Sequence, residues 1–276
     1  MQRSFRQVDV FSAEPFLGNP VAVVLDGTGL TSAQMQAFAN WTNLSETTFV
    51  LPADQPDADY QVRIFTPSVE LPFAGHPTLG TCHAWLESGN SPQRSGQIVQ
   101  QCGVGLVTIR RSAGLLGFAA PPLRRSGPVD EPLIRQIAAQ LGIARADIVD
   151  AQWADNGPGW IAILLGSAQA VLEVSPSDGD LDLGVAGPFP PGSECAFEVR
   201  AFFPAGGRSV EDPVTGSLNA SLAQWLLSAG RASAPYLVSQ GTAIGRRGRV
   251  RIDADEDGTV WVSGATATRI TGEVDL

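Results

Sequence analysis

Four polar side chains in the sequence are of the types that hold or move protons: Glu46, His76, Asp212 and Ser217. Three of them belong to a repeated segment. Residues 62–76 read VRIFTPSVELPFAGH, and residues 199–217 read VRAFFPAGGRSVEDPVTGS, with a four-residue insertion. The second copy has Asp212 where the first has Leu71, and it ends in a serine where the first ends in a histidine. These differences place polar groups at two related turns and predict an active site where the turns converge.

Glu46 lies in a different motif, NLSETTFV at residues 43–50, between the end of a predicted helix and a strand. We expect its counterpart in the second half to be NGPGWIAI at residues 156–163, which contains no carboxylate. If the two halves face each other, only one side supplies a glutamate. A single base would then have to remove a proton and also return it.

The segments that must position these residues are strands with a few helices. β-Branched and aromatic residues in partial alternation predict strands, and apolar residues at helical spacing behind Ser, Thr or Pro predict helices. In the first half the predicted strands cover residues 6–11, 22–26, 47–53 and 58–67, and the helices cover 31–43 and 77–88. In the second half a helix over 131–142 precedes strands over 160–166 and 196–204 and a helix over 218–230.

The second half thus repeats the order of the first, and residues 236–252 also resemble residues 98–110. Four similar elements in the same order favour a duplication into two facing domains. We expect domains over residues 1–120 and 121–262, with a C-terminal strand over about 263–276 completing the first and a Pro/Gly-rich linker over 119–132. Each repeated turn begins a helix, so backbone N–H groups at the two helix starts should hold a carboxylate.

Composition excludes several classes of function. The net charge of −10 opposes a nucleic-acid partner, and no apolar run is long enough to span a membrane. The N-terminal stretch has no apolar signal region, so we expect a cytoplasmic protein. All 18 basic residues are arginine, which excludes lysine Schiff bases and lysine-containing phosphate loops. We expect no cofactor, since no glycine-rich dinucleotide motif follows a predicted strand.

Cysteine and histidine usage argues against a metal site. Cys82, Cys102 and Cys195 lie far apart in the sequence and match no zinc spacing, so we expect reduced, mostly buried thiols. The only histidines are His76 and His83, and no H-E-x-x-H motif occurs. His83 lies two helical turns after His76 and is expected to pack in the core.

Motifs spread over nearly the whole chain resemble the phenazine-biosynthesis isomerase-like (PhzF-like) family. They are VDVFSAEPFLGNPVAVV, NLSETTFV, FTPSVELPFAGHPTLG, VEDPVTGSLNASLAQWL and QGTAIGRRG. The resemblance implies an α+β, diaminopimelate-epimerase-like fold with two pseudo-symmetric domains. Each domain is a curved, mostly antiparallel sheet around a central helix, and the site lies in the cleft between them. Family analogy also implies a homodimer.

The resemblance also implies roles for individual residues. The glutamate that matches Glu46 carries a proton from one carbon to another of a small unsaturated carboxylic acid, without a cofactor. The aspartate that matches Asp212 hydrogen-bonds the substrate or tunes the proton transfer. The residues that match His76 and Ser217 orient the substrate beside backbone amides near Gly75 and Gly216. One departure is Arg247-Gly248, where the family commonly has Pro-Ser.

Each of these residues also has an ordinary structural interpretation. Asp212 before a proline could cap a helix, Glu46 could be a surface carboxylate, and His76 could satisfy a backbone carbonyl. Three other functions stay open: a two-base epimerase or racemase of the same fold, a serine hydrolase using Ser217, and a non-catalytic ligand-binding or interaction module. The first would need a cysteine at each turn, and the second would usually show a G-x-S-x-G motif.

Overall fold

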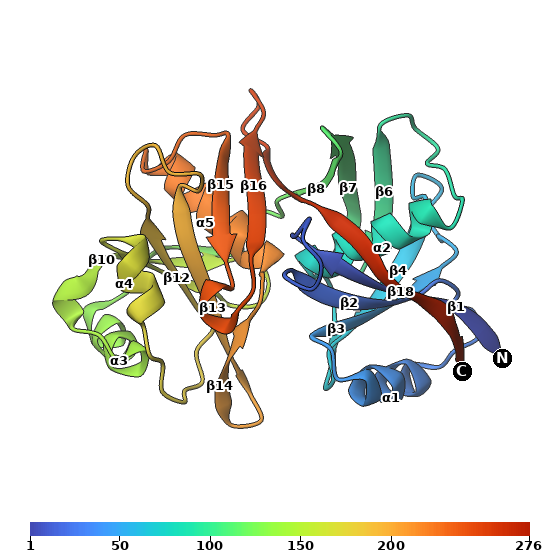
Figure 1. Cartoon of the computed structure of the whole chain (residues 1–276), viewed down its shortest axis with the longest axis horizontal. Coiled ribbons are helices and arrows are strands. Elements are labelled where there is room, and N and C mark those ends of the chain that lie inside the picture. Colours follow the sequence, from blue (N-terminus) through green and yellow to red (C-terminus); the bar gives the residue numbers. More distant parts are fainter. The chain divides into compact units, whose positions relative to one another are not determined.

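The structure is a computed structural model that describes all residues, 1–276, and it divides into two compact units (Figure 1). Unit 1 consists of residues 1–119 and 263–276, and unit 2 consists of residues 120–262. Both units combine a mixed sheet with a few helices, and each is described by itself. None of the helices combines the length and the apolar character that crossing a membrane requires.

Unit 1 is a curved row of strands around one buried helix. The hydrogen-bonded neighbours run β18–β1–β2–β3–β4–β6–β7–β8, with β2–β3 and β4–β6 parallel and the other pairs in this row antiparallel. The elements are β1 (Gln2–Val10), β2 (Asn19–Val24), α1 (Ser32–Thr42), β3 (Glu46–Leu51), β4 (Tyr60–Phe65), β5 (Glu70–Leu71), α2 (Gly75–Glu87), β6 (Gln97–Cys102), β7 (Gly105–Ser112), β8 (Leu115–Ala119) and β18 (Thr266–Asp275).

Unit 2 repeats this arrangement. Its strands run β9–β10–β11–β12–β13–β15–β16, and the parallel pairs, β11–β12 and β13–β15, occupy the same places in the order. The elements are β9 (Arg125–Pro128), α3 (Glu131–Leu141), a 3₁₀ turn (Arg145–Asp147), β10 (Ile148–Asp155), β11 (Ile161–Leu165), α4 (Ala168–Glu173), β12 (Leu183–Pro188), β13 (Phe197–Ala205), β14 (Arg208–Asp212), α5 (Gly216–Ser228), β15 (Tyr236–Gln240), a 3₁₀ turn (Thr242–Ile244), β16 (Gly248–Ala254) and β17 (Val260–Gly264).

The repeats exchange their last strands. β9 follows the first repeat in the chain but pairs with β10 of unit 2, and β18 follows the second repeat but pairs with β1 of unit 1. The predicted linker over residues 119–132 contains the boundary between the units, at residues 119/120, and its residues 125–128 form β9. Backbone pairing with β10 overrides the Pro/Gly composition, and the Arg125 guanidinium stacks 3.2 Å from the centre of the Trp153 ring.

The central helices α2 and α5 are apolar around most of their circumference, which is typical of buried helices. In α2 every residue from Gly75 to Cys82 is buried, and in α5 the same holds from Gly216 to Ala223. Neither helix has a side-chain cap at its N-terminus, where Ala74 and Thr215 are the N-cap residues. Each helix begins with a glycine followed by a polar residue, Gly75-His76 in α2 and Gly216-Ser217 in α5.

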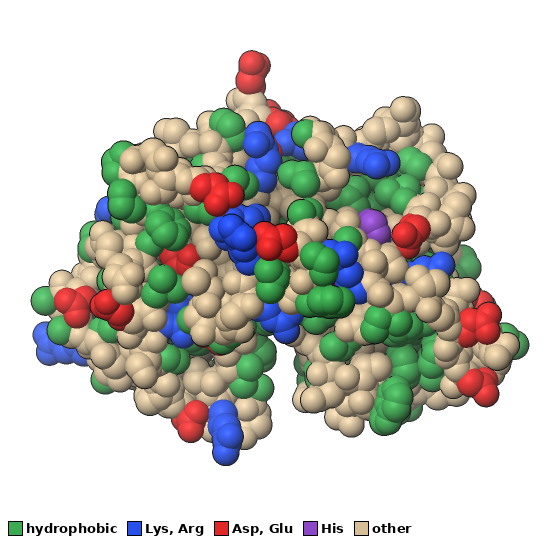
Figure 2. All heavy atoms as spheres, viewed as in Figure 1, with side chains coloured by type: hydrophobic (Ala, Val, Ile, Leu, Met, Phe, Trp, Pro, Cys, Tyr) green, Lys and Arg blue, Asp and Glu red, His purple; other side chains and the backbone are tan.

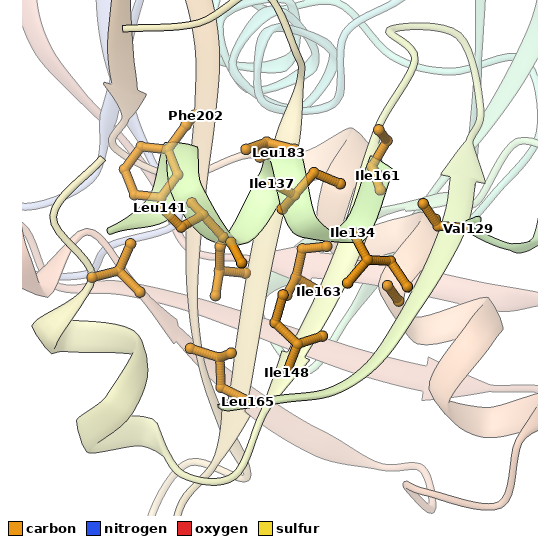
Figure 3. Packing of buried hydrophobic residues seen from close by; sticks show 14 of the residues in the cluster. Val129, Ile134, Ile137, Leu141, Ile148, Ile161, Ile163, Leu165, Leu183 and Phe202 are labelled. Carbon is orange, nitrogen blue, oxygen red and sulfur yellow. The ribbon is translucent and has the colours of Figure 1, made fainter. Parts of the chain in front are cut away.

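The outer helices complete separate cores. In unit 2, α3 inserts Ile134, Ile137 and Leu141 between side chains of β10, β11 and β12 (Figure 3). In unit 1, Met35 and Phe38 of α1 pack on Phe49 and Phe65, while Trp41 is 81% exposed and stacks on the Phe38 ring. The three-residue spacing of these residues predicted the helix, and α1 includes Trp41, but the Trp41 side chain lies on the exposed side of the helix.

Charged side chains are distributed over the surface rather than gathered. On the face shown in Figure 2, acidic and basic side chains are interspersed on both units. Many of them form exposed pairs, such as Arg94 with Asp57 at 2.7 Å and Arg251 with Asp253 at 2.9 Å. Such exposed pairs contribute little to stability.

Candidate active site

Glu46 and His76 are in direct contact within unit 1. Glu46 is the first residue of β3, whose parallel pairing with β2 sets it beside Val21. His76 is the second residue of α2. The two elements bring the His76 Nε2 atom within 3.2 Å of the Glu46 Oε2 atom, and the side chains are only 4% and 14% exposed. The sequence expected both residues at the site, but not that they would touch.

The second nitrogen of the His76 ring contacts Asn19, the first residue of β2. The Asn19 Nδ2 atom lies 3.3 Å from the His76 Nδ1 atom. Burial lowers the pKa of His76 to about 3, against an opposing effect of the Pro20 backbone carbonyl, so the ring is neutral near pH 7. The Glu46 carboxyl group and the Asn19 amide therefore lie at the two nitrogens of a neutral ring, which carries a single proton.

Asp212 and Ser217 flank the start of α5 in unit 2. Asp212 ends β14, and its Oδ2 atom accepts a hydrogen bond from the Thr215 hydroxyl at 2.5 Å. The Ser217 hydroxyl oxygen accepts from the Trp160 indole Nε1 at 3.1 Å. Asn156 donates through Nδ2 to the Ser217 carbonyl at 2.8 Å. Neither of these two hydrogen bonds uses the Ser217 hydroxyl proton, so the hydroxyl can donate it to another acceptor.

The structure thus groups the candidate residues by unit. Glu46, His76 and the Gly75 turn belong to unit 1, whereas Asp212, Ser217 and the Gly216 turn belong to unit 2. Sequence reasoning missed Asn19 and Asn156, which support the residues at equivalent positions of the two central helices. The signal that could have found them was present, because Asn19 begins β2 and Asn156 lies shortly before β11, in similar Gly/Pro-containing segments.

The expected counterpart of the Glu46 segment was wrong. Residues 156–163 lead into β11, which corresponds to β2, and the counterpart of β3 is β12 because each is the parallel neighbour. In the β2–β3 pair, Glu46 lies beside Val21, and in the β11–β12 pair, Leu183 lies beside Ile161. Leu183 of β12 is thus the residue that corresponds to Glu46. The equivalent position is therefore apolar. Asp182 precedes it, and burial, assisted by the nearby Asp155 charge, raises the pKa of Asp182 to about 6.

None of the cysteines belongs to these two turns. Cys82 and Cys195 are buried and Cys102 is partly buried. Burial raises the pKa of Cys82 to about 12, so its thiol is not ionised near pH 7. His83 is half-buried, and its Nδ1 atom lies 3.0 Å from the Thr266 hydroxyl. No group of three or more His, Cys, Asp or Glu side chains is arranged to hold a metal ion.

This arrangement suits proton transfer better than nucleophilic attack. A serine hydrolase needs its serine hydroxyl to donate to a histidine nitrogen and a carboxylate to orient that histidine. Here both nitrogens of His76 face Glu46 and Asn19, and Asp212 is bound to Thr215. A buried carboxylate beside a neutral imidazole N–H can instead accept a proton and release it again.

Known proteins resemble this chain over nearly its whole length. The family model described as "Phenazine biosynthesis-like protein" (PhzC-PhzF) matches residues 8–273. The Antisense-enhancing sequence 1 protein of Schizosaccharomyces pombe is 35% identical, over 99% of this chain and 98% of its own. The trans-2,3-dihydro-3-hydroxyanthranilate isomerase of Pseudomonas aeruginosa is 34% identical, over 98% of each chain.

Solved structures share the whole fold. A PhzF-family phenazine biosynthesis protein from Bacillus anthracis superposes with a TM-score of 0.83 over 100% of both chains, at 21% sequence identity. Epimerases are also among the structural neighbours. The α+β, diaminopimelate-epimerase-like fold expected from the sequence is confirmed.

Proposed function

The chain belongs to the phenazine biosynthesis-like family and is an isomerase, and from this premise we propose that it shifts a hydrogen within a small unsaturated carboxylic acid. In this proposal Glu46 is the single acid/base and no cofactor takes part. The observation that carries it is the contact between Glu46 and neutral His76. It puts one shielded carboxylate beside a buried, neutral imidazole ring.

Glu46 would act in both directions. Its carboxylate would take a proton from one carbon of the substrate and deliver it to another, so that the residue ends as it began. The His76 ring, 3.2 Å from the Oε2 atom, would position that carboxylate oxygen and leave the other for the substrate. Because Glu46 begins a strand at the centre of the sheet and His76 begins a buried helix, both groups are held on rigid elements.

The remaining candidate residues would bind and orient the acid. We propose that backbone N–H groups near Gly75 and Gly216 hold its carboxylate, since neither helix start is capped by a side chain. The Ser217 hydroxyl and Asp212 would hold its polar substituents. Negative charge that develops when the C–H bond breaks would be stabilised by these donors.

The proposed substrate class follows from the named relative. The Pseudomonas aeruginosa relative is a trans-2,3-dihydro-3-hydroxyanthranilate isomerase, so cyclic dihydro-hydroxy acids of this type are the first candidates for this chain. A ring acid of this kind carries a carboxylate for the amides, polar substituents for Asp212 and Ser217, and an acidified C–H for Glu46.

The test is to incubate such acids with the protein in heavy water and to follow the substrate by NMR. We expect isomerisation, and we expect Glu46→Gln to slow it by at least about 100-fold, the usual size of a lost general acid/base. The matched control is Glu256→Gln, an exposed glutamate in the turn before β17. Isomerisation at the wild-type rate in Glu46→Gln would remove Glu46 from its role, and no turnover of any candidate acid would favour a binding module.

A further inference from the structure

One buried side chain near the site has no role in the proposed chemistry so far. Gln240 is the last residue of β15, is fully buried and makes four hydrogen bonds. Its Oε1 atom accepts from the Thr215 backbone N–H at 3.0 Å and from the Asn219 Nδ2 atom at 2.8 Å. Its Nε2 atom donates to the Thr215 hydroxyl oxygen at 2.9 Å and to the Asp212 carbonyl at 3.3 Å.

These bonds fix the direction of the Thr215 hydroxyl. Because the Gln240 amide donates to the hydroxyl oxygen, the hydroxyl proton points away from Gln240. It is donated to the Asp212 Oδ2 atom, and the 2.5 Å separation is that of a strong bond to a charged acceptor. The result is a chain of two hydrogen bonds, in which the Gln240 amide donates to the Thr215 hydroxyl and the hydroxyl donates to the Asp212 carboxylate.

Unit 1 lacks all three members of this chain. The repeated segments align Leu71 with Asp212 and Ala74 with Thr215. Gly103 and Gly241 pack against equivalent prolines, Pro72 and Pro213, so the residues before these glycines, Cys102 and Gln240, correspond as well. The fold is the same in both units, and therefore it does not require these three polar groups.

We propose that Gln240 is a positioning residue that, through the Thr215 hydroxyl, holds the Asp212 carboxylate ionised and in one orientation for the substrate. That Asp212 meets the substrate rests on the proposed function. The positioning itself is a property of unit 2 and can be measured without any substrate.

The experiment measures the pKa of the Asp212 carboxyl by carbon-13 NMR in the full chain, with Asp212→Asn to assign the signal. Thr215→Val removes the hydroxyl donor, and we expect the pKa of Asp212 to rise by about one unit. Thr215→Ser keeps a hydroxyl and should leave the pKa near its wild-type value. The charged residues on neighbouring segments, Glu211 with its partner Arg200 and Arg246, are unchanged in all these variants.

The control lies in unit 1. Thr78 is also fully buried at the start of a central helix, and its hydroxyl accepts from the Gln100 amide at 3.0 Å. It donates to the Ala74 carbonyl rather than to a carboxylate. Thr78→Val should therefore lower stability without moving the pKa of Asp212. An equal shift in Thr78→Val, or no shift in Thr215→Val, would overturn the proposal.

A double-variant cycle tests whether Gln240 acts through Thr215. Gln240→Met should raise the pKa of Asp212, and the double variant with Thr215→Val should show no larger shift than Thr215→Val alone. Additive shifts would mean that Gln240 acts independently, which contradicts the proposal. If Gln240→Met does not fold, the comparison of Thr215→Val with Thr215→Ser and Thr78→Val still decides the role of the hydroxyl.

If the proposed function also holds, Thr215→Val should lower kcat/KM for the accepted acid by about 10-fold. This is the factor that corresponds to the free energy of one lost hydrogen bond. Thr215→Ser should restore it. A shifted pKa in a protein that isomerises no acid would support the positioning and reject the function. An unshifted pKa of Asp212 in Thr215→Val, in a protein that does isomerise an acid, would support the function and reject the positioning.

Discussion

His76 Nε2 lies 3.2 Å from Glu46 Oε2, and the histidine is neutral because burial lowers its pKa to about 3. Because the ring is neutral near pH 7, this close contact is not an ion pair there. A neutral partner holds the carboxylate without supplying a full positive charge. This relationship leads to a prediction about stability as well as about catalysis.

The free energy of unfolding should fall in mild acid because of His76. In the unfolded chain the ring has its ordinary pKa of 6.5, against about 3 in the folded chain. Between these values the unfolded chain binds more protons, so stability is full above pH 6.5 and is lost as the pH falls. At pH 5 the loss from this residue should be about 2 kcal/mol relative to pH 7.5.

Urea unfolding of the wild type and His76→Gln at both pH values measures this loss. The variant should show a smaller difference between the two pH values. His83→Gln is the comparison, because burial also lowers the pKa of the half-buried His83. An unchanged difference in His76→Gln would mean that folding does not lower the pKa of the ring.

Alkylation of the cysteines should leave isomerase activity intact. Burial raises the pKa of Cys82 to about 12 and also raises the pKa of Cys102 and Cys195, so few thiolates are present at pH 8. Mass spectrometry after iodoacetamide treatment should find little labelling in the native protein and three labels in urea. Loss of activity in step with labelling would instead support a cysteine-based, two-base epimerase.

Two glycines should be intolerant of even one methyl group. A Cβ on Gly80 of α2 would lie 2.3 Å from a Val21 methyl, and a Cβ on Gly184 of β12 would lie 2.2 Å from a Leu218 methyl of α5. Gly80→Ala and Gly184→Ala should each lower the free energy of unfolding by about 1–3 kcal/mol through overpacking. A Cβ on Gly272 meets nothing within 4 Å, so Gly272→Ala is the matched control.

Thermal or urea unfolding of the three variants decides this prediction. Equal stability of Gly80→Ala and Gly272→Ala would show that α2 can move away from β2. Because α2 carries His76, such freedom would also weaken the argument that the Glu46 contact is rigid.

The Trp160 indole should affect substrate binding through Ser217. Its Nε1 donates to the Ser217 hydroxyl at 3.1 Å and so leaves the hydroxyl proton for the substrate. Trp160→Phe should raise KM by about 2- to 10-fold, the value of one hydrogen bond, with a smaller change in kcat. Trp261→Phe, which loses an indole bond to Asp255 in the same unit, should leave KM unchanged. Steady-state kinetics with an accepted acid distinguish the two variants.

The sequence predicted the elements well where their pattern is local. The helix expected over residues 131–142 is α3, Glu131–Leu141, because Asp130 caps it and Gly142 ends it in a left-handed conformation. The strand expected over 160–166 is β11, Ile161–Leu165, a fully buried apolar run. Both central helices begin slightly earlier than predicted, since Gly75 and Gly216 are helical rather than part of the preceding turns.

Long-range pairing was harder to predict. Residues 119–132 resemble a linker in composition, yet Arg125–Pro128 forms a strand because the edge of β10 is available to pair with it. Similarly, the match of the Glu46 segment to residues 156–163 followed local sequence and failed, because the parallel pairing of β12 with β11 defines the true equivalence. Register depends on partner strands that lie far away in the sequence.

The sequence by itself determined the family, the α+β fold class and the duplicated order of elements, since these depend on motifs and periodicity that each segment carries alone. Only the tertiary structure decided that Glu46 touches a neutral His76, that the repeats exchange β9 and β18, and that Gln240 directs a hydroxyl toward Asp212. Protonation and hydrogen-bond direction depend on burial and on the atoms within about 3 Å of a group. Those neighbours come from segments that meet only when the chain is folded.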